Sequence, residues 1–66
     1  MSLEADLLSL SSTLDQMLER LESMADEVRD TDRDEILGGI YDVERHLRSA
    51  NRRINRTLLA EREGPL

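Results

Sequence analysis

The sequence contains no cysteine, no tryptophan and no phenylalanine, and Tyr41 is the only aromatic residue among its 66. Without cysteine, the chain forms neither disulfides nor thiolate metal sites. Its one histidine, His46, has no second imidazole with which to build a zinc site. A domain of this size buries only about 60% of the surface that its unfolded chain exposes. Because disulfides and metals are excluded, we expect oligomerisation to supply the missing stability.

Long hydrophobic stretches are absent as well. No segment approaches the roughly 20 apolar residues of a transmembrane helix or shows the apolar centre of a signal peptide. We therefore predict no membrane span and expect a cytoplasmic protein. The shortage of aromatic side chains argues against a compact globular core, because such cores gain much of their buried area from aromatics. Thin packing of long helices suits this composition better.

Regularly spaced apolar residues fill the first half of the chain. They advance in alternating steps of four and three, the spacing that keeps one stripe of an α-helix against a partner helix. A second series with the same spacing fills most of the second half. The first series is Leu3, Leu7, Leu10, Leu14, Met17, Leu21, Met24 and Val28, and the second is Ile36, Ile40, Val43, Leu47, Ala50, Ile54 and then Thr57 or Leu58.

Between the two series, residues 29–35 contain no apolar side chain. Ile36 restarts the pattern one residue out of phase, so a continuous helix would carry its second stripe about 100° away from the first. A turn explains the break better, because Thr31 is a good N-cap and acidic residues follow it. A single straight helix with a register skip is the alternative.

We therefore predict an all-α helical hairpin that forms one domain over residues 1–66. Helix 1 is expected over about 3–29, the turn over about 30–32, helix 2 over about 32–62 and a C-terminal tail over 63–66. Ser2 is expected to cap helix 1, and Gly64 and Pro65 are expected to end helix 2.

The apolar stripe of each helix is wider than one contact line. Additional apolar residues lie beside the two series, and a two-helix hairpin with one internal contact line would leave them in water. Two hairpins packed about a two-fold axis would cover them, which predicts a homodimer in the form of an antiparallel four-helix bundle. These flanking residues are Leu8, Leu18, Ala25, Leu37 and Leu58.

The residues expected at the oligomer interface come from both series and their flanks. They are Leu7, Leu10, Leu14, Met17, Leu18, Leu21, Met24, Val28, Ile36, Leu37, Ile40, Val43, Leu47, Ala50, Ile54 and Leu58. Such a coiled-coil hairpin is typical of a non-enzymatic protein–protein interaction module: a small homo-oligomeric adaptor, scaffold or regulator. Another helical protein is a second partner of the same kind.

The acidic residues around the turn resemble a calcium loop in their spacing over 30–34. An EF-hand loop needs glycine at its sixth position and glutamate at its twelfth. Counted from Asp30, these positions hold Glu35 and Tyr41. The acids therefore read as helix-capping and solvated residues, and we predict no metal, no cofactor, no catalytic residue and no enzymatic activity.

Charge is distributed unevenly along a chain of net charge −6. Residues 1–44 hold thirteen acids against three arginines, whereas residues 45–66 hold two acids against six arginines. Five arginines form a candidate face for an anion or an acidic partner. Nucleic acid is disfavoured by the net charge and by the lack of aromatics that would stack on bases. The five are Arg45, Arg48, Arg52, Arg53 and Arg56.

In its length, its paired apolar series and its acidic turn without glycine or proline, the chain resembles the Rop family of helical hairpins. This resemblance implies a dimeric bundle and an RNA-binding face on helix 1 that includes basic residues and a phenylalanine. Helix 1 here has no phenylalanine and only Arg20 and Arg29. An RNA-binding hairpin that uses the arginines of helix 2 is therefore the alternative function.

Two short stretches, residues 24–28 and 47–53, are similar to parts of Q-SNARE motifs. That resemblance implies a parallel four-helix bundle of unbroken helices with a central glutamine. Thr31 stands where the glutamine would be, and the register after it is out of step.

Overall fold

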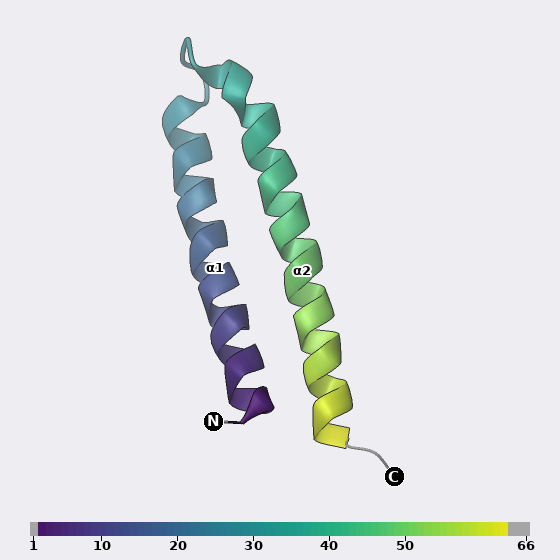
Figure 1. The fold of residues 1–66 in the computed structure, drawn as a ribbon. Helices are drawn as coiled ribbons and strands as arrows, with labels where there is room; N and C mark the ends of the chain where they lie inside the picture. The colour runs from purple at the N-terminus through teal and green to yellow at the C-terminus, as the bar shows by residue number, and fades with distance from the viewer. Residues whose placement is uncertain (1, 64–66) are drawn as a thin grey trace.

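The computed structural model describes residues 2–63 and consists of two long antiparallel helices joined by a tight turn (Figure 1). Helix α1 spans Leu3–Val28, a single 3₁₀ turn η1 spans Asp34–Ile36, and helix α2 spans Leu37–Glu63. The predicted all-α hairpin is confirmed, and the straight-helix alternative is wrong. The expected helix-ending role of Gly64 and Pro65 lies outside the described residues.

Helix α1 begins with the predicted cap. The Ser2 side-chain oxygen accepts a hydrogen bond from the Ala5 backbone N–H at 3.0 Å. Glu4 and Asp6 lie in the first turn, where negative charge interacts favourably with the positive end of the helix. The local sequence therefore fixes this terminus without help from tertiary contacts.

The turn is organised by Thr31, but not in the predicted way. Its hydroxyl donates to the Val28 carbonyl at 2.6 Å and accepts from the Arg33 N–H at 3.1 Å. Asp30 takes a left-handed conformation with φ of 64°, which aspartate tolerates better than most residues. Thr31 thus closes the end of α1 instead of capping α2.

Helix 2 consequently starts later than predicted. Because the Thr31 hydroxyl is bound to the end of α1, the chain needs further residues to reverse. The 3₁₀ turn begins after Arg33, which makes no side-chain cap, and the α-helix begins at Leu37.

The hairpin is a single layer of two helices. Its principal extents are 56 × 18 × 11 Å and its radius of gyration is 15.6 Å, whereas a globular domain of this length has a radius near ~11 Å. Its accessible surface of 5196 Å² exceeds the ~4,300 Å² expected for a folded monomer of this mass. The fold therefore exposes far more surface than a self-sufficient domain.

Gly38 and Gly39 lie in the first turn of α2, and a Cβ added to either would meet no other atom within 4 Å. We expect Gly38→Ala to raise the free energy of unfolding by about 0.5–1 kcal/mol, because alanine loses less backbone entropy in a helix. Urea denaturation at fixed protein concentration measures this change. Gly39→Ala provides the comparison: if it destabilises while Gly38→Ala stabilises, a neighbouring chain packs against Gly39. Destabilisation by both would contradict the open space seen here.

Candidate interaction surface

The two helices contact one another along a line rotated from the predicted one. The residues on this line, which we call the inner seam, are buried or half-buried. Their apolar members are Leu7, Leu14, Leu18, Leu21, Ala25 and Val28 on α1 and Leu37, Ile40, Leu47, Ile54 and Leu58 on α2. Within residues 2–63, only Ala25, Ile40 and Leu58 among the apolar side chains count as fully buried. The hairpin alone thus has a very small core.

The remaining residues of the two predicted series stay exposed. We call them the exposed stripe. Half of the surface of Leu10 and nearly half of those of Met24 and Val43 remain in contact with water, at 54%, 47% and 46%. Its members are Leu3, Leu10, Met17 and Met24 on α1, Ile36 at the end of η1, and Val43 and Ala50 on α2.

This division corrects the expectation for the flanking residues. Leu18, Ala25, Leu37 and Leu58 were expected to lie outside the contact within one hairpin, but all four lie on the inner seam, and of the five flanking residues Leu8 alone stays exposed. The prediction was thus correct for the half of each series that lies on the inner seam, and wrong for the half that the flanking residues replace in the contact between the helices.

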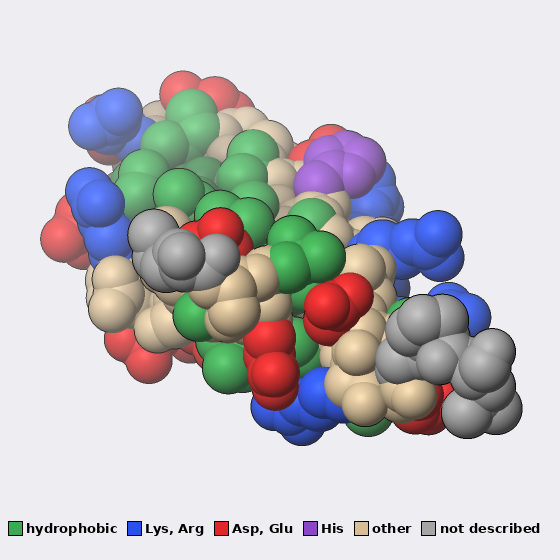
Figure 2. Space-filling view, turned by 60° about the horizontal axis from the view of Figure 1, so that its bottom comes forward, with side chains coloured by type: hydrophobic (Ala, Val, Ile, Leu, Met, Phe, Trp, Pro, Cys, Tyr) green, Lys and Arg blue, Asp and Glu red, His purple; other side chains and the backbone are tan. Residues whose placement is uncertain are grey.

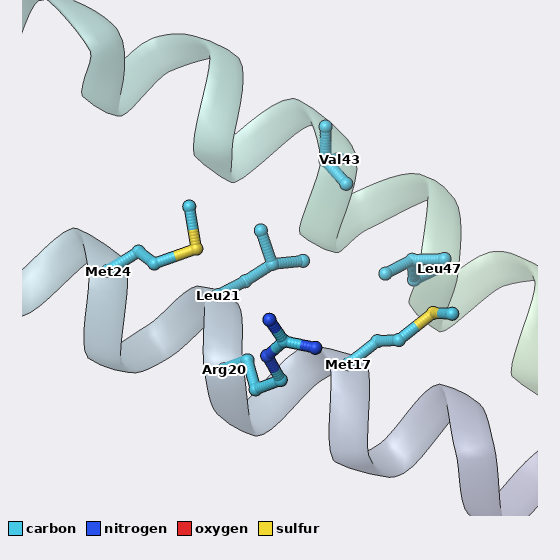
Figure 3. Close-up of a pocket in the computed structure, with 6 residues that line it drawn as sticks. All are labelled: Met17, Arg20, Leu21, Met24, Val43 and Leu47. Carbon is cyan, nitrogen blue, oxygen red and sulfur yellow. The ribbon is translucent and has the colours of Figure 1, made fainter.

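An apolar hollow shows that the exposed stripes of both helices share one face (Figure 3). It has a volume of about 290 Å³, with Leu21 and Leu47 of the inner seam at its base. Met17 and Met24 of α1 and Val43 of α2 form its walls, and Arg20 lies at its border. Since residues seven apart repeat on one side of a helix, the other stripe members extend this face.

The space-filling view shows the same segregation over a larger area. Apolar side chains gather over one part of the surface in view, and charged side chains lie mostly around them (Figure 2). A contiguous apolar patch bordered by polar groups is the usual mark of a protein interaction site.

The other flank of the inner seam carries hydrogen bonds between the helices. Ser11 Oγ donates to Asn51 Oδ1 at 2.6 Å, and Asn51 Nδ2 donates to Asp15 Oδ1 at 2.9 Å. Near the chain ends, Arg62 Nε donates to Glu4 Oε1 at 2.8 Å. These bonds explain the rotation of the helices, because the predicted contact line would have separated their partners.

A buried carboxylate belongs to the same polar flank. Glu44 is 4% exposed, and its Oε2 accepts a hydrogen bond from Arg48 Nη2 at 3.0 Å. Arg48 also lies 3.7 Å from Glu22 on α1. The second carboxylate oxygen of Glu44, Oε1, has no hydrogen-bond partner. This charged group therefore depends on Arg48 alone for neutralisation.

Arg29 links the end of α1 to the beginning of α2. Its guanidinium donates to the Tyr41 hydroxyl at 3.1 Å and to Asp26 Oδ1 at 2.7 Å. The hydrogen bond to Tyr41 and then that to Asp26 raise the pKa of Arg29 above its ordinary value. This contact gives the single aromatic residue a role in closing the turn.

The five arginines of the predicted anion-binding face do not act as one group. Arg45 pairs with Asp42 at 3.0 Å, and Arg48 is engaged by Glu44 and Glu22. Arg52, Arg53 and Arg56 make no ion pair within residues 2–63. Arg53 and Arg56 border a second surface hollow of about 280 Å³, which Thr57 and Ala60 also line.

The described residues contain no group of three or more histidine, aspartate or glutamate side chains placed to hold a metal. His46 is exposed. Neither α1 nor α2 is long and apolar enough to cross a membrane.

Sequence reasoning overlooked Ser11, Glu44 and Asn51 as contact residues. A signal was present: Ser11 is spaced by seven from Leu18, and Glu44 and Asn51 are spaced by seven between Leu37 and Leu58. A polar residue at a position where the seven-residue spacing predicts an apolar one indicates a hydrogen bond or ion pair with the other helix.

We expect Arg48→Ala to lower the free energy of unfolding by about 1–2 kcal/mol, because it leaves the buried Glu44 carboxylate without a counter-ion. Glu44→Leu alone should leave the free energy of unfolding unchanged or raise it. In the double variant, Arg48→Ala should cost little, because no buried carboxylate is left unpaired. Urea denaturation of the four proteins measures the coupling, and Arg52→Ala is the matched control on an unpaired arginine. Equal losses from Arg48→Ala in both backgrounds would show that Glu44 and Arg48 are not coupled.

No protein-family model matches this chain, and no curated protein or solved structure is significantly similar to it. The proposals for its function therefore stand on its own geometry: a hairpin with one apolar face, one hydrogen-bonded face and an uneven distribution of charge.

Proposed function

We propose that this protein is a non-enzymatic protein–protein interaction module, a small homo-oligomeric adaptor, scaffold or regulator that acts through helix–helix packing. The observation that carries the proposal is the exposed stripe, which forms a continuous apolar face with a hollow between Met17, Met24 and Val43. Interaction through this face accounts for apolar residues that the hairpin itself does not bury.

The exposed area matches the needs of a dimer. The chain exposes about 900 Å² more than a typical folded monomer of its mass. A standard protein interface buries about 800 Å² on each partner. One partner that covers the apolar face would therefore bring the accessible surface to an ordinary value.

A second copy of the chain is the occupant that we propose. Its exposed stripe has the same spacing, so the side chains of one stripe meet the gaps of the other, as in coiled-coil packing. Two hairpins joined in this way make a four-helix bundle, which we propose is antiparallel. The seam residues then form one core shared by four helices.

We expect Met24→Glu to convert the dimer into monomers, because it places a charge in the centre of the apolar face. Ser23→Glu is the matched control, since it introduces the same charge at the adjacent exposed position, outside the exposed stripe. Size-exclusion chromatography with light scattering measures the mass of each protein. A monomeric wild-type chain, or a Met24→Glu variant that stays dimeric, would contradict the proposal.

We also expect the melting temperature of the wild-type chain to rise with protein concentration, because a folded state that exists as a dimer is stabilised by mass action. Circular dichroism from micromolar to millimolar concentration measures this. Leu14→Asp on the inner seam should lose helix and dimer together, since the seam residues form the shared core. A melting temperature independent of concentration would favour a stable monomer.

Nucleic-acid binding by α2 is the second candidate, and one observation favours it: Arg52, Arg53 and Arg56 have no ion-pair partner within residues 2–63. If these side chains bind phosphates, log affinity for RNA or DNA falls linearly with log salt concentration. Arg52→Glu with Arg53→Glu should then weaken binding and flatten the slope. Fluorescence anisotropy at two salt concentrations measures this, and no binding at low salt would exclude the function.

A further inference from the structure

We propose that Leu10 of a second copy inserts into the apolar hollow between α1 and α2. The inference rests on the proposed homodimer and names the side chain that fills this hollow. Each copy then contributes one hollow, near its turn, and one Leu10, in the open half of the hairpin away from the turn. The contact therefore forms twice in the dimer.

The first argument is the position of the hollow along the hairpin. Helix α1 runs from Leu3 to Val28, so its middle lies between residues 15 and 16. The part of α1 that lines the hollow, residues 17–24, lies entirely on the turn side of this point. On α2, Val43 and Leu47 lie nearer the turn than Asn51, whose hydrogen bonds reach the middle of α1. The hollow is therefore displaced from the centre of the hairpin toward the turn.

The second argument is a protruding side chain in the other half. Leu10 belongs to the exposed stripe and keeps 54% of its surface in water. In a face-to-face antiparallel pair, α1 of one copy lies over α1 of the other. If the ends of these two helices coincide, Leu10 lies level with Leu21 at the base of the other copy's hollow, and Leu7 lies level with Met24. The spacing of the apolar series therefore allows knobs-into-holes packing in this register.

The third argument concerns the orientation of the two copies. If both turns lay at one end, each hollow would oppose the hollow of the other copy, and neither would receive Leu10. That arrangement would also bring together residues 22–44 of both copies, each with nine acids against two arginines. Like charges repel at such short separations, so the charge excess near the turn favours the orientation in which Leu10 meets the hollow.

An exchange of side-chain size tests the contact. We expect Leu10→Ala to weaken dimerisation about a hundredfold, because two buried leucine side chains are truncated in each dimer. Val43→Phe should also weaken dimerisation, since the larger ring occupies the space that Leu10 needs. In the Leu10→Ala background, Val43→Phe should instead strengthen dimerisation, because the ring fills the vacated volume. Analytical ultracentrifugation measures the dissociation constant of each protein.

Leu3→Ala is the matched control, because Leu3 is a similarly exposed leucine of the same stripe and helix but lies outside the hollow. Val43→Phe should weaken dimerisation as much in the Leu3→Ala background as in the wild-type chain. If Val43→Phe has the same effect in the Leu10→Ala background as in the other two, the assignment of Leu10 to the hollow is wrong and the homodimer stands.

Crosslinking tests which residues face one another, separately from affinity. Because the chain has no cysteine, Leu10→Cys and Met24→Cys each introduce a single thiol. The two proteins are refolded as an equal mixture, at a concentration where both are dimeric, and treated with a short bis-maleimide. The mixed product should dominate, since Leu10 of one copy lies against the hollow that Met24 borders in the other. Products that join either variant mainly to itself would overturn this inference and leave the homodimer intact. A chain that is monomeric throughout would overturn both.

Discussion

A helix that carries three adjacent lines of apolar residues cannot bury all of them against one neighbour, and this constraint governs the whole molecule. In the hairpin, each helix turns two of its lines inward and leaves the third, with Met24 and Val43, in water. Only a second layer of helices could cover it. The small core, the large accessible surface and the proposed dimer all follow from this one geometric limit.

The choice of which lines turn inward depends on polar side chains. Asn51 bonds to Ser11 and Asp15, and Arg48 lies between Glu44 and Glu22. These contacts close one face of the hairpin with hydrogen bonds and leave the other face apolar. A hairpin packed on the predicted contact line would have had two half-apolar faces and no clear partner surface. The polar contacts therefore leave one face of the hairpin apolar.

The distribution of charge along the hairpin can favour one orientation of a partner on this face. Apolar packing between two similar stripes favours close contact but does not distinguish strongly between parallel and antiparallel copies. The excess of nine acids over two arginines in residues 22–44 disfavours an arrangement that brings the turns of two copies together. Such long-range terms set orientation and partner choice more than affinity, and they respond to salt.

The sequence by itself determined two long amphipathic helical segments with a break at 29–35, because apolar spacing and the polar gap are local properties of the chain. It favoured a reversal near Thr31 over a straight helix, and the structure decided between the two. The sequence also determined how many adjacent lines of apolar residues each helix carries. Only the tertiary structure decided which lines meet, since that depends on pairs such as Asp15 and Asn51, which lie far apart in sequence. The late start of α2 at Leu37 was likewise decided in three dimensions, because the Thr31 hydroxyl bonds to the end of α1 instead of capping the next helix.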